Sequence, residues 1–169
     1  MTLAELDRVA NPAICEVGRL RSPNAGEGDG HSTLVFARYV SGRHGTLTSV
    51  DKDAGTEPVC RKLLCDSHIG DARVSFISQD ANDTALWEKM CPIDLLYLDG
   101  WDLNDPDSAR QHLLCFLLAE PGIKQGGLVL VDDTGMPGLG KGRLVVPVAV
   151  LMGWQVLHQG FQTLLRKPA

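Results

Sequence analysis

The chain has 169 residues, of which 44 % are hydrophobic and 22 % charged, and its net charge is −5. These proportions suit a chain that folds around a packed core, and they argue against bulk disorder. An acidic chain lacks the basic footprint that tight binding to nucleic acid phosphates requires. No apolar run approaches the roughly 18 residues that span a bilayer. We therefore expect neither a nucleic acid nor a membrane as a partner.

The five cysteines are odd in number, and most of them lie in apolar runs. No two are spaced as C-x-x-C, so the sequence predicts neither a zinc site nor a redox motif. Reduced, buried thiols are typical of cytosolic proteins. We expect a cytoplasmic protein.

Short apolar runs alternate with helical stretches along most of the chain. The predicted strands are 13–17, 46–50, 74–77, 93–98 and 128–131, and the predicted helices are 31–40, 57–64, 84–90, 108–119 and 144–151. This alternation is typical of βαβ units and a mostly parallel sheet. The run Ile-Asp-Leu-Leu-Tyr-Leu at 93–98 is almost wholly apolar, as expected of a central strand that is covered on both faces.

Two further strands are predicted at the end of the chain, at 154–158 and 162–165. The short turn between them contains Gln159-Gly160, which favours an antiparallel hairpin. No internal repeat or low-complexity segment interrupts this order. We expect a single domain over 1–169, with a short N-terminal segment at 1–12 and no separate cap domain.

Acidic side chains follow every predicted parallel strand. In open α/β sheets, ligands bind beyond the carboxyl ends of the strands, where the strand order reverses. A carboxylate beside an apolar core is costly to desolvate without a partner, so the sheet itself does not require this pattern. The residues at these ends are Glu16 and Gly18, Asp51, Asp80, Asp99, and Asp132 with Asp133. They predict a polar ligand site along one edge of the sheet.

A glycine-rich loop precedes the first long helix, which opens at His31 and Ser32. The loop contains Gly26, Gly28 and Gly30. Glycines let a backbone pass close to a ligand, and the free amides at a helix start favour an anionic group. Either Gly18 or Gly26 makes the close approach, and a plain flexible turn would also explain the loop. His31 is predicted to line the ligand pocket or to cap the helix.

Asp51 follows the glycine-rich loop by roughly 20 positions, a spacing at which an acid can accept hydrogen bonds from both hydroxyls of a ribose. The alternative is a surface acid at a strand end. Asp80, next to Ala81, is placed to accept from an exocyclic amine, although a cap for the next helix would explain it equally well. Trp101 packs against an adenine or a substrate, or belongs to the core.

These motifs resemble class I S-adenosylmethionine-dependent methyltransferases, in particular the small-molecule, catechol-type O-methyltransferases. Ala-Ile-Cys-Glu-Val-Gly at 13–18 resembles their first motif, Gly30-His31-Ser32-Thr33 its end, and Thr48-Ser49-Val50-Asp51 the second motif. The most specific matches are 93–101 and 127–134. The resemblance covers 14–166 and implies a Rossmann-like three-layer α/β sandwich. Its seven-stranded sheet would be mostly parallel, with a C-terminal antiparallel hairpin.

The resemblance implies S-adenosylmethionine as cofactor and O-methylation of a small-molecule hydroxyl. The residues it places around the cofactor are Glu16, Gly18, Gly28, Gly30, His31, Ser32, Asp51, Asp80, Ala81, Asp99 and Trp101. In metal-dependent members, residues like Asp99, Asp132 and Asp133 hold Mg²⁺, which lowers the pKa of the substrate hydroxyl. The resemblance thus also predicts a magnesium site, with Asp99 and Asp102 as catalytic residues.

Several positions depart from the family pattern. Asp133 stands where metal-dependent members usually have asparagine, and Asp102 stands where catechol-type enzymes have a lysine base, although a carboxylate is a weaker base. The few residues before the first strand leave three alternatives for the site: it is open, it is closed by another chain in a homodimer, or it is built for a bulky substrate. Residues 138–142, Gly-Leu-Gly-Lys-Gly, are predicted to be a mobile loop without the arrangement of a phosphate-binding P-loop.

Two other functions compete with methyl transfer. A non-catalytic binding module would use the same cofactor site without turnover. A nicotinamide-dependent oxidoreductase requires G-x-G-x-x-G, but the third glycine position falls on His31 or Thr33, depending on where the count begins. The sequence therefore favours the methyltransferase.

Overall fold

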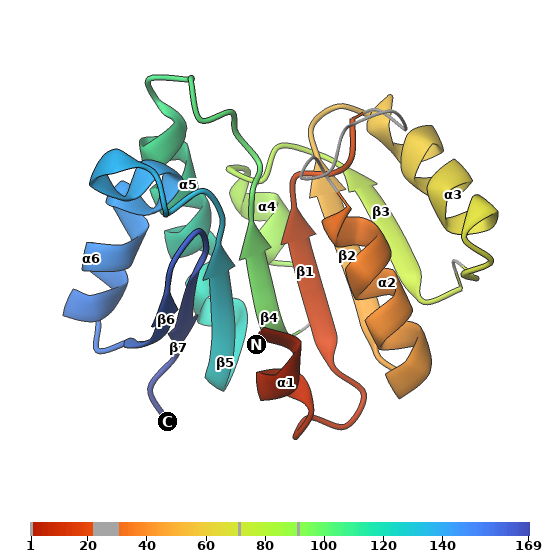
Figure 1. The fold of residues 1–169 in the computed structure, drawn as a ribbon, viewed down its shortest axis with the longest axis horizontal. Coiled ribbons are helices and arrows are strands. Elements are labelled where there is room, and N and C mark those ends of the chain that lie inside the picture. The colour runs from red at the N-terminus through yellow and green to blue at the C-terminus, as the bar shows by residue number, and fades with distance from the viewer. Residues whose placement is uncertain (1, 22–30, 71, 91) are drawn as a thin grey trace.

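The computed structural model describes residues 2–21, 31–70, 72–90 and 92–169. A seven-stranded sheet with strand order β3-β2-β1-β4-β5-β7-β6 runs through the middle of the molecule (Figure 1). The strands are β1 (Ala13–Val17), β2 (Thr46–Asp51), β3 (Val74–Ser78), β4 (Ile93–Leu98), β5 (Ile123–Val131), β6 (Gln155–Gln159) and β7 (Thr163–Arg166). Strands β1 to β5 pair in parallel, and β7 pairs antiparallel with both β5 and β6. The predicted fold class and C-terminal hairpin are confirmed.

Helices cover both faces of this sheet. They are α1 (Thr2–Leu6), α2 (Ser32–Arg43), α3 (Thr56–Asp66), α4 (Thr84–Trp87), α5 (Ser108–Ala119) and α6 (Val145–Leu151), with short 3-10 segments η1 (Glu120–Gly122) and η2 (Pro137–Arg143). Buried side chains of α1, α2 and α3 pack on one face, and those of α4, α5 and α6 pack on the other. None of the helices in the described ranges is long and apolar enough for a bilayer crossing.

Several boundaries differ from the predicted ones for local reasons. Helix α2 runs on to Arg43, where His44 adopts a left-handed conformation and its N–H bonds the carbonyl of Val40. Strand β5 begins at Ile123, five residues earlier than predicted. Its first residues pair with β4 across a shift in register, and Gly126 has a positive φ of 71°. Such an irregularity lets the strand continue through a bend. Helix α1 lies in the short N-terminal segment at 1–12, for which no helix was predicted.

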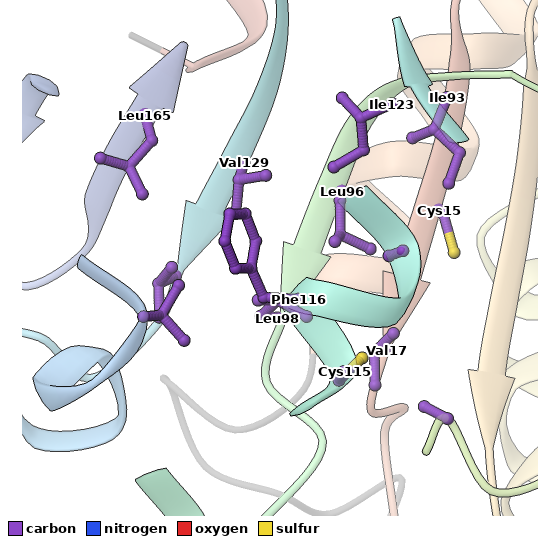
Figure 2. Packing of buried hydrophobic residues seen from close by; sticks show 14 of the residues in the cluster. Cys15, Val17, Ile93, Leu96, Leu98, Cys115, Phe116, Ile123, Val129 and Leu165 are labelled. Carbon is purple, nitrogen blue, oxygen red and sulfur yellow. The ribbon is translucent and has the colours of Figure 1, made fainter. Parts of the chain in front are cut away.

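Burial of the central strand β4 on both of its faces explains why its sequence is almost wholly apolar. All six of its residues are buried, and successive side chains point to opposite faces. Leu96 and Leu98 join the cluster around Phe116 of α5 (Figure 2). Tyr97 faces the other layer, where its ring meets Phe36 of α2 edge to face at 5.4 Å. Each face of β4 is therefore closed by a helix.

The face of helix α5 that packs on the sheet is not the face that carries most of its leucines. Its buried side chains include His112, Cys115, Phe116 and Ala119, which follow the i, i+3, i+4, i+7 spacing of one helix face. Leu114 and Leu117, although apolar, are 43 % and 42 % exposed. The buried polar His112 thus points toward the sheet and the residues beyond its edge.

The strand order reverses between β1 and β4. After β1 the chain builds outward through β2 and β3, and it then returns to place β4 on the opposite side of β1. Crossover connections on either side of this point leave a crevice above the carboxyl ends of the two strands. The fold therefore positions the residues after β1 and β4 at a ligand-binding edge.

Two neighbouring residues of α5 test this packing. We expect Phe116→Ala to lower the free energy of unfolding by about 3–5 kcal/mol, because the side chain is fully buried and its removal leaves a cavity. The matched control Leu117→Ala is expected to cost less, about 1 kcal/mol, because its side chain is 42 % exposed. Denaturant unfolding monitored by circular dichroism measures both values. Equal losses of unfolding free energy in the two variants would show that α5 turns a different face toward the sheet.

Candidate active site

Residues from the ends of four parallel strands line one narrow groove at the predicted edge. The groove is lined by Gly18 after β1, Asp51 at the end of β2, Asp80 and Ala81 after β3, and Trp101 after β4. It encloses only about 10 Å³, but a cavity of about 250 Å³ shares Asp51 and Trp101 with it. Five of the residues predicted to bind the cofactor are therefore together. Gly26, Gly28 and Gly30 lie outside the described residues.

Gly18 is required by the close approach of two loops. Its φ is +94°, and a Cβ atom there would lie 2.5 Å from the carbonyl oxygen of Asp99 and 2.9 Å from the Cα of Gly100. Any side chain would push the loop after β1 away from the loop after β4. Gly18 therefore fixes how closely these two strand ends meet.

Asp51 is oriented by the backbone that follows β1. The backbone N–H of Arg19 donates to Oδ2 of Asp51 at 3.0 Å, and the N–H of Asp53 donates to Oδ1 at 2.9 Å. A carboxylate has about four acceptor positions, so both oxygens can still accept from a ligand. The Arg19 side chain is only 4 % exposed and donates to the carbonyls of Asp51 and Ile77 at 3.2 and 3.1 Å. Arg19 thus ties the ends of β2 and β3 together.

Asp80 and Trp101 both line the groove. The cap of α4 is Asp83, whose side chain accepts from the N–H of Ala85 at 3.0 Å, so Asp80 is not the cap of this helix. Asp80 instead accepts from the N–H of Asn82 at 2.9 Å and lines the groove. Trp101 belongs to the core cluster, where its ring packs edge to face against His112 at 5.0 Å, and it also lines the groove. Its contact with an adenine or a substrate stays a prediction.

Glu16 is fully buried and surrounded by hydroxyl groups. Ser32 donates to its Oε1 at 2.5 Å, while Thr33 and Ser49 each donate to its Oε2 at 2.7 Å. Burial raises the pKa of Glu16 to about 7, and the three hydroxyl hydrogen bonds oppose this rise by stabilising the carboxylate. Because no part of Glu16 is exposed, it can act on a ligand through Ser32, which lines a large cavity.

Two cavities meet at the carboxylates of Asp99 and Asp132. The larger, of about 500 Å³, lies between α1, the start of α2 and the β6–β7 turn. Its lining is mainly apolar and includes Leu3, Val35, Phe36, Leu130 and Phe161, with His31, Ser32, Tyr97 and Gln162 as polar members. The second cavity, of about 400 Å³, is lined mostly by charged residues and shares Asp99, Asp132 and Phe161 with the first. Asp99 and Asp132 thus stand between an apolar and a charged compartment.

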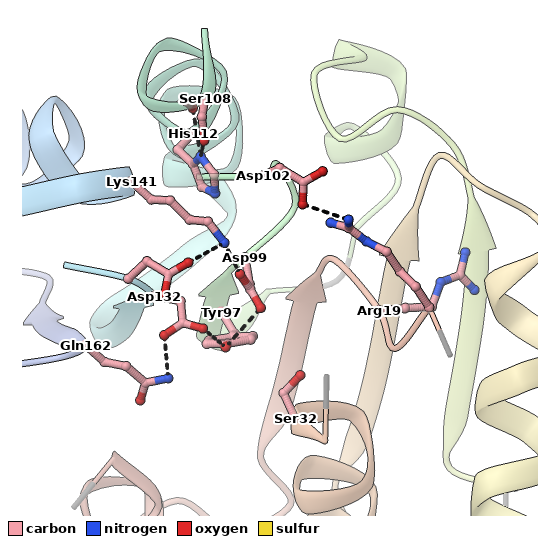
Figure 3. A network of polar contacts seen from close by, with 12 residues as sticks. Arg19, Ser32, Tyr97, Asp99, Asp102, Ser108, His112, Asp132, Lys141 and Gln162 are labelled. Carbon is pink, nitrogen blue, oxygen red and sulfur yellow. Dashed lines mark hydrogen bonds and ion pairs between the residues drawn. The ribbon is translucent and has the colours of Figure 1, made fainter. Parts of the chain in front are cut away.

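A lysine lies among the three carboxylates at the ends of β4 and β5. The Nζ of Lys141 pairs with Oδ1 of Asp99 (Figure 3). It also pairs with Oδ2 of Asp133 at 2.9 Å. The Lys141 side chain is only 7 % exposed. Burial alone would lower its pKa, but the two carboxylates more than compensate, and the pKa of Lys141 lies above its ordinary value. Lys141 is therefore held as an ammonium.

Asp132 is held by different donors. The hydroxyl of Tyr97 donates to its Oδ2 at 2.7 Å, and the amide of Gln162 donates to its Oδ1 at 2.9 Å (Figure 3). Burial raises the pKa of Asp99, an effect that Lys141 opposes and the neighbouring Asp132 and Asp133 reinforce. Every carboxylate of the cluster already has at least one donor from the protein.

The segment η2 places Lys141 in this cluster. Gly138, Leu139 and Gly140 all have positive φ, and a Cβ atom at Gly140 would lie 2.1 Å from the carbonyl oxygen of Asp133. The backbone just before Lys141 therefore packs directly against the residue whose side chain Lys141 pairs with. On the other side, a Cβ atom at Gly142 would lie 2.6 Å from Cγ2 of Thr134. Within the loop predicted at 138–142, residues 140–142 are therefore closely packed and contain a buried lysine.

The residues of this cluster do not fit a metal ion as they are arranged. An ion bound to Asp99 and Asp133 would have to occupy the space taken by the Lys141 ammonium. Both oxygens of Asp132 already accept hydrogen bonds, one from Tyr97 and the other from Gln162. Over the described ranges, no group of three or more His, Cys, Asp or Glu side chains is arranged to hold a metal. The predicted magnesium site at Asp99, Asp132 and Asp133 is not formed.

Asp102, predicted to be catalytic, lies at the rim of the charged cavity. Its Oδ1 pairs with Nη1 of Arg21 at 2.7 Å, and the Asp102 side chain is 67 % exposed. Exposed pairs of this kind contribute little to stability, so the pair chiefly sets where the carboxylate points. Asp102 and Lys141 both line the cavity, and the catalytic role of Asp102 stays a prediction.

Sequence reasoning missed four residues of this site, namely Arg19, Tyr97, Lys141 and Gln162. Tyr97 carried a weak signal, because its hydroxyl is the one polar group besides Asp94 in an otherwise apolar strand. Lys141 carried another, because glycines at 138, 140 and 142 permit close backbone packing around it. Arg19 and Gln162 become recognisable only when β1, β3 and the β6–β7 turn are placed in space.

The comparisons with known proteins agree with this geometry. A family model described as a methyltransferase domain matches residues 24–134. The chain belongs to this methyltransferase family. No curated protein matches the chain.

Solved structures show the fold of this methyltransferase domain. NSun6 from Pyrococcus horikoshii, solved with SFG, is 14 % identical with a TM-score of 0.71, and the match covers 96 % of this chain and 50 % of that protein. An O-methyltransferase family protein from Burkholderia thailandensis is 19 % identical with a TM-score of 0.63, covering 94 % and 51 %. The O-methyltransferase TomG from Streptomyces achromogenes, solved with SAM, is 18 % identical with a TM-score of 0.64, covering 99 % and 77 %. The chain spans about half the length of the first two.

The buried Glu16 predicts how the stability of the methyltransferase domain depends on pH. Between pH 4.5, the ordinary pKa, and about 7, the folded protein holds a proton that the unfolded chain has lost. The stabilisation from this proton is fully present below pH 4.5 and is lost as the pH rises through about 7. The total effect is about 3 kcal/mol.

We expect Glu16→Gln to remove this part of the pH dependence, because glutamine does not titrate. Urea unfolding of the wild type and the variant across this pH range measures the difference. The control Glu57→Gln, at a partly exposed residue that pairs with Arg61 on α3, should keep the wild-type slope. An unchanged slope in Glu16→Gln would show that Glu16 is ionised throughout the range in the folded protein.

Proposed function

We propose that this protein transfers the methyl group of S-adenosylmethionine to the oxygen of a small-molecule hydroxyl. The observation that carries the proposal is the continuity of the site. The narrow groove at the ends of β1 to β4 is lined by a set of residues suited to an adenosine. Asp99, whose backbone touches Gly18 of that groove, also lines the two larger cavities. A cofactor and an acceptor can therefore meet at Asp99.

The cofactor's nucleoside would lie along the groove. Asp51 would accept hydrogen bonds from the ribose hydroxyls, since both of its oxygens are oriented by backbone N–H groups and retain acceptor capacity. Asp80 would accept from the exocyclic amine of adenine, with Ala81 and Trp101 forming the walls. Gly18 allows the close backbone approach that leaves the groove open to the cofactor.

The amino-acid end of the cofactor would lie near the start of α2, beside His31 and Ser32. A serine hydroxyl has one proton, and Ser32 donates it to Glu16. The oxygen of Ser32 is therefore suited to accept from the cofactor's ammonium group. Glu16 would act indirectly, by setting the direction of the Ser32 hydroxyl.

Methyl transfer in this site would be a single displacement. A lone pair of the acceptor oxygen attacks the methyl carbon, the carbon–sulfur bond breaks, and the electron pair neutralises the sulfonium of the departing S-adenosylhomocysteine. The hydroxyl proton passes to a carboxylate of the charged cavity, for which Asp102 is the candidate. Positioning of the two reactants provides most of the acceleration in such a reaction.

The cavity lining favours an acceptor with an apolar body. The compartment of about 500 Å³ is within the usual size of small-molecule sites and is lined largely by aliphatic and aromatic side chains. Polar groups, including Tyr97 and Asp132, gather at the end shared with the charged cavity. A phenol or similar compound would place its ring in the apolar part and its hydroxyl at these groups.

Cofactor binding is tested by calorimetry with S-adenosylmethionine, S-adenosylhomocysteine and NAD. We expect both adenosyl compounds to bind and NAD not to bind. Asp51→Ala should weaken S-adenosylmethionine binding roughly 10- to 100-fold, because it removes charge-assisted hydrogen bonds to the ribose. The control Asp66→Ala removes an exposed acid of α3 that pairs with Lys62 and should leave the affinity unchanged. Binding of NAD alone would replace this proposal with a nicotinamide-dependent function.

Turnover is tested with methyl-labelled S-adenosylmethionine and catechol or phenol as probe acceptors. We expect label to appear on the acceptor oxygen, with release of S-adenosylhomocysteine. Tight cofactor binding without transfer to any hydroxyl compound in a broad acceptor panel would instead support a binding module without turnover.

A further inference from the structure

The charge balance at the ends of β4 and β5 differs from what a magnesium-dependent site would need. Three carboxylates lie close together there, and carboxylates in such a cluster repel one another unless a cation lies among them. Lys141 supplies that cation, with its Nζ in contact with both Asp99 and Asp133. The remaining acid, Asp132, is stabilised by Tyr97 and Gln162. The protein thus neutralises the cluster with its own side chains.

The ammonium is not a loosely placed surface group. The Lys141 side chain is 7 % exposed, and the turn that carries it is packed against the backbone carbonyl of Asp133 through Gly140. For a divalent ion to enter, Lys141 would have to leave both carboxylates and its own buried position. A buried ion pair that loses one partner leaves an uncompensated charge, which opposes that movement.

We propose that the Lys141 ammonium is a built-in cation that takes the place of a metal ion in this site, so that methyl transfer proceeds without a divalent metal. An ammonium has three N–H donors, and contacts with Asp99 and Asp133 use two of them. Lys141 also lines the charged cavity, and an acceptor oxygen bound there would meet the third donor. There the positive charge would favour the deprotonated oxygen, the species that attacks the methyl group. The catalytic part of this inference rests on the proposed function, whereas the charge replacement does not.

Metal binding tests the replacement without any assay of turnover. We expect wild-type protein, freed of metals with EDTA, to leave the electron paramagnetic resonance spectrum of added Mn²⁺ unchanged and to keep its melting temperature. Lys141→Ala should bind Mn²⁺, because it leaves three carboxylates without their cation and hard divalent ions prefer such oxygen ligands. The control Lys62→Ala removes an exposed lysine paired with Asp66 and should not bind Mn²⁺.

A second variant keeps this test decisive. Lys141→Ala combined with Asp133→Asn removes one of the carboxylates and should weaken the acquired Mn²⁺ binding at least tenfold. If Lys141→Ala unfolds alone, we expect added Mn²⁺ to raise its melting temperature. Stoichiometric Mn²⁺ binding by the wild type that is lost in Asp99→Asn would overturn the proposal, as would a folded Lys141→Ala that gains no Mn²⁺ affinity. If Lys141→Ala does not fold even with Mn²⁺, the Mn²⁺ binding of the wild type alone decides whether the proposal holds.

Turnover adds an independent test of the catalytic part. With an acceptor that is methylated, EDTA should leave wild-type kcat unchanged, and Lys141→Met should lower kcat about 100-fold or more while calorimetry shows unchanged S-adenosylmethionine affinity. If EDTA lowers the kcat of the wild type and added Mg²⁺ restores it, the proposal is overturned. Failure to bind S-adenosylmethionine at all would count against the proposed function, whereas the Mn²⁺ comparison would still decide the role of Lys141.

Discussion

The ends of β4 and β5 bring three carboxylates to one place, and the rest of the site depends on how their charge is balanced. Parallel strands align their carboxyl ends, so acids that follow neighbouring strands are forced together by the sheet itself. Asp99 follows β4, and Asp132 and Asp133 follow β5. Such a group is stable only with compensating donors, which here are an ammonium, a phenol and an amide.

The balance is achieved by segments that are distant in sequence. Lys141 comes from the turn after β5, Tyr97 from within β4, and Gln162 from the turn between β6 and β7. The C-terminal hairpin pairs antiparallel with β5, and this pairing brings its turn to the same edge as the carboxyl ends of the parallel strands. The hairpin therefore contributes to the site as well as closing the sheet.

The nucleoside side of the edge is organised by backbone contacts more than by charge. Gly18 lets the loop after β1 touch the loop after β4, and the N–H of Arg19 then points at Asp51. Behind this contact, Glu16 binds the hydroxyls of Ser32, Thr33 and Ser49, and so links β1 with the start of α2 and with β2. One half of the site is thus set by close backbone packing, and the other half by ion pairs.

The amino-acid sequence determined the fold and the location of the site. Apolar runs such as 93–98, separated by helical stretches, specified a parallel sheet, because only strands covered on both faces are apolar throughout. Acids after each strand then marked the edge, and the groove lined by Gly18, Asp51, Asp80, Ala81 and Trp101 agrees with that reasoning. These inferences succeed because they depend on local periodicity and on a general rule about where parallel strands end.

The tertiary structure decided what the acids do. Sequence reasoning grouped Asp99, Asp132 and Asp133 around a metal ion, because it counted only the carboxylates and had no means of placing Lys141 among them. The position of this lysine depends on three successive positive φ angles and on packing of Gly140 against Asp133, neither of which produces a hydrophobic period. Partners that come from separate loops are fixed only by the folded chain, and here they determine which cation the site contains.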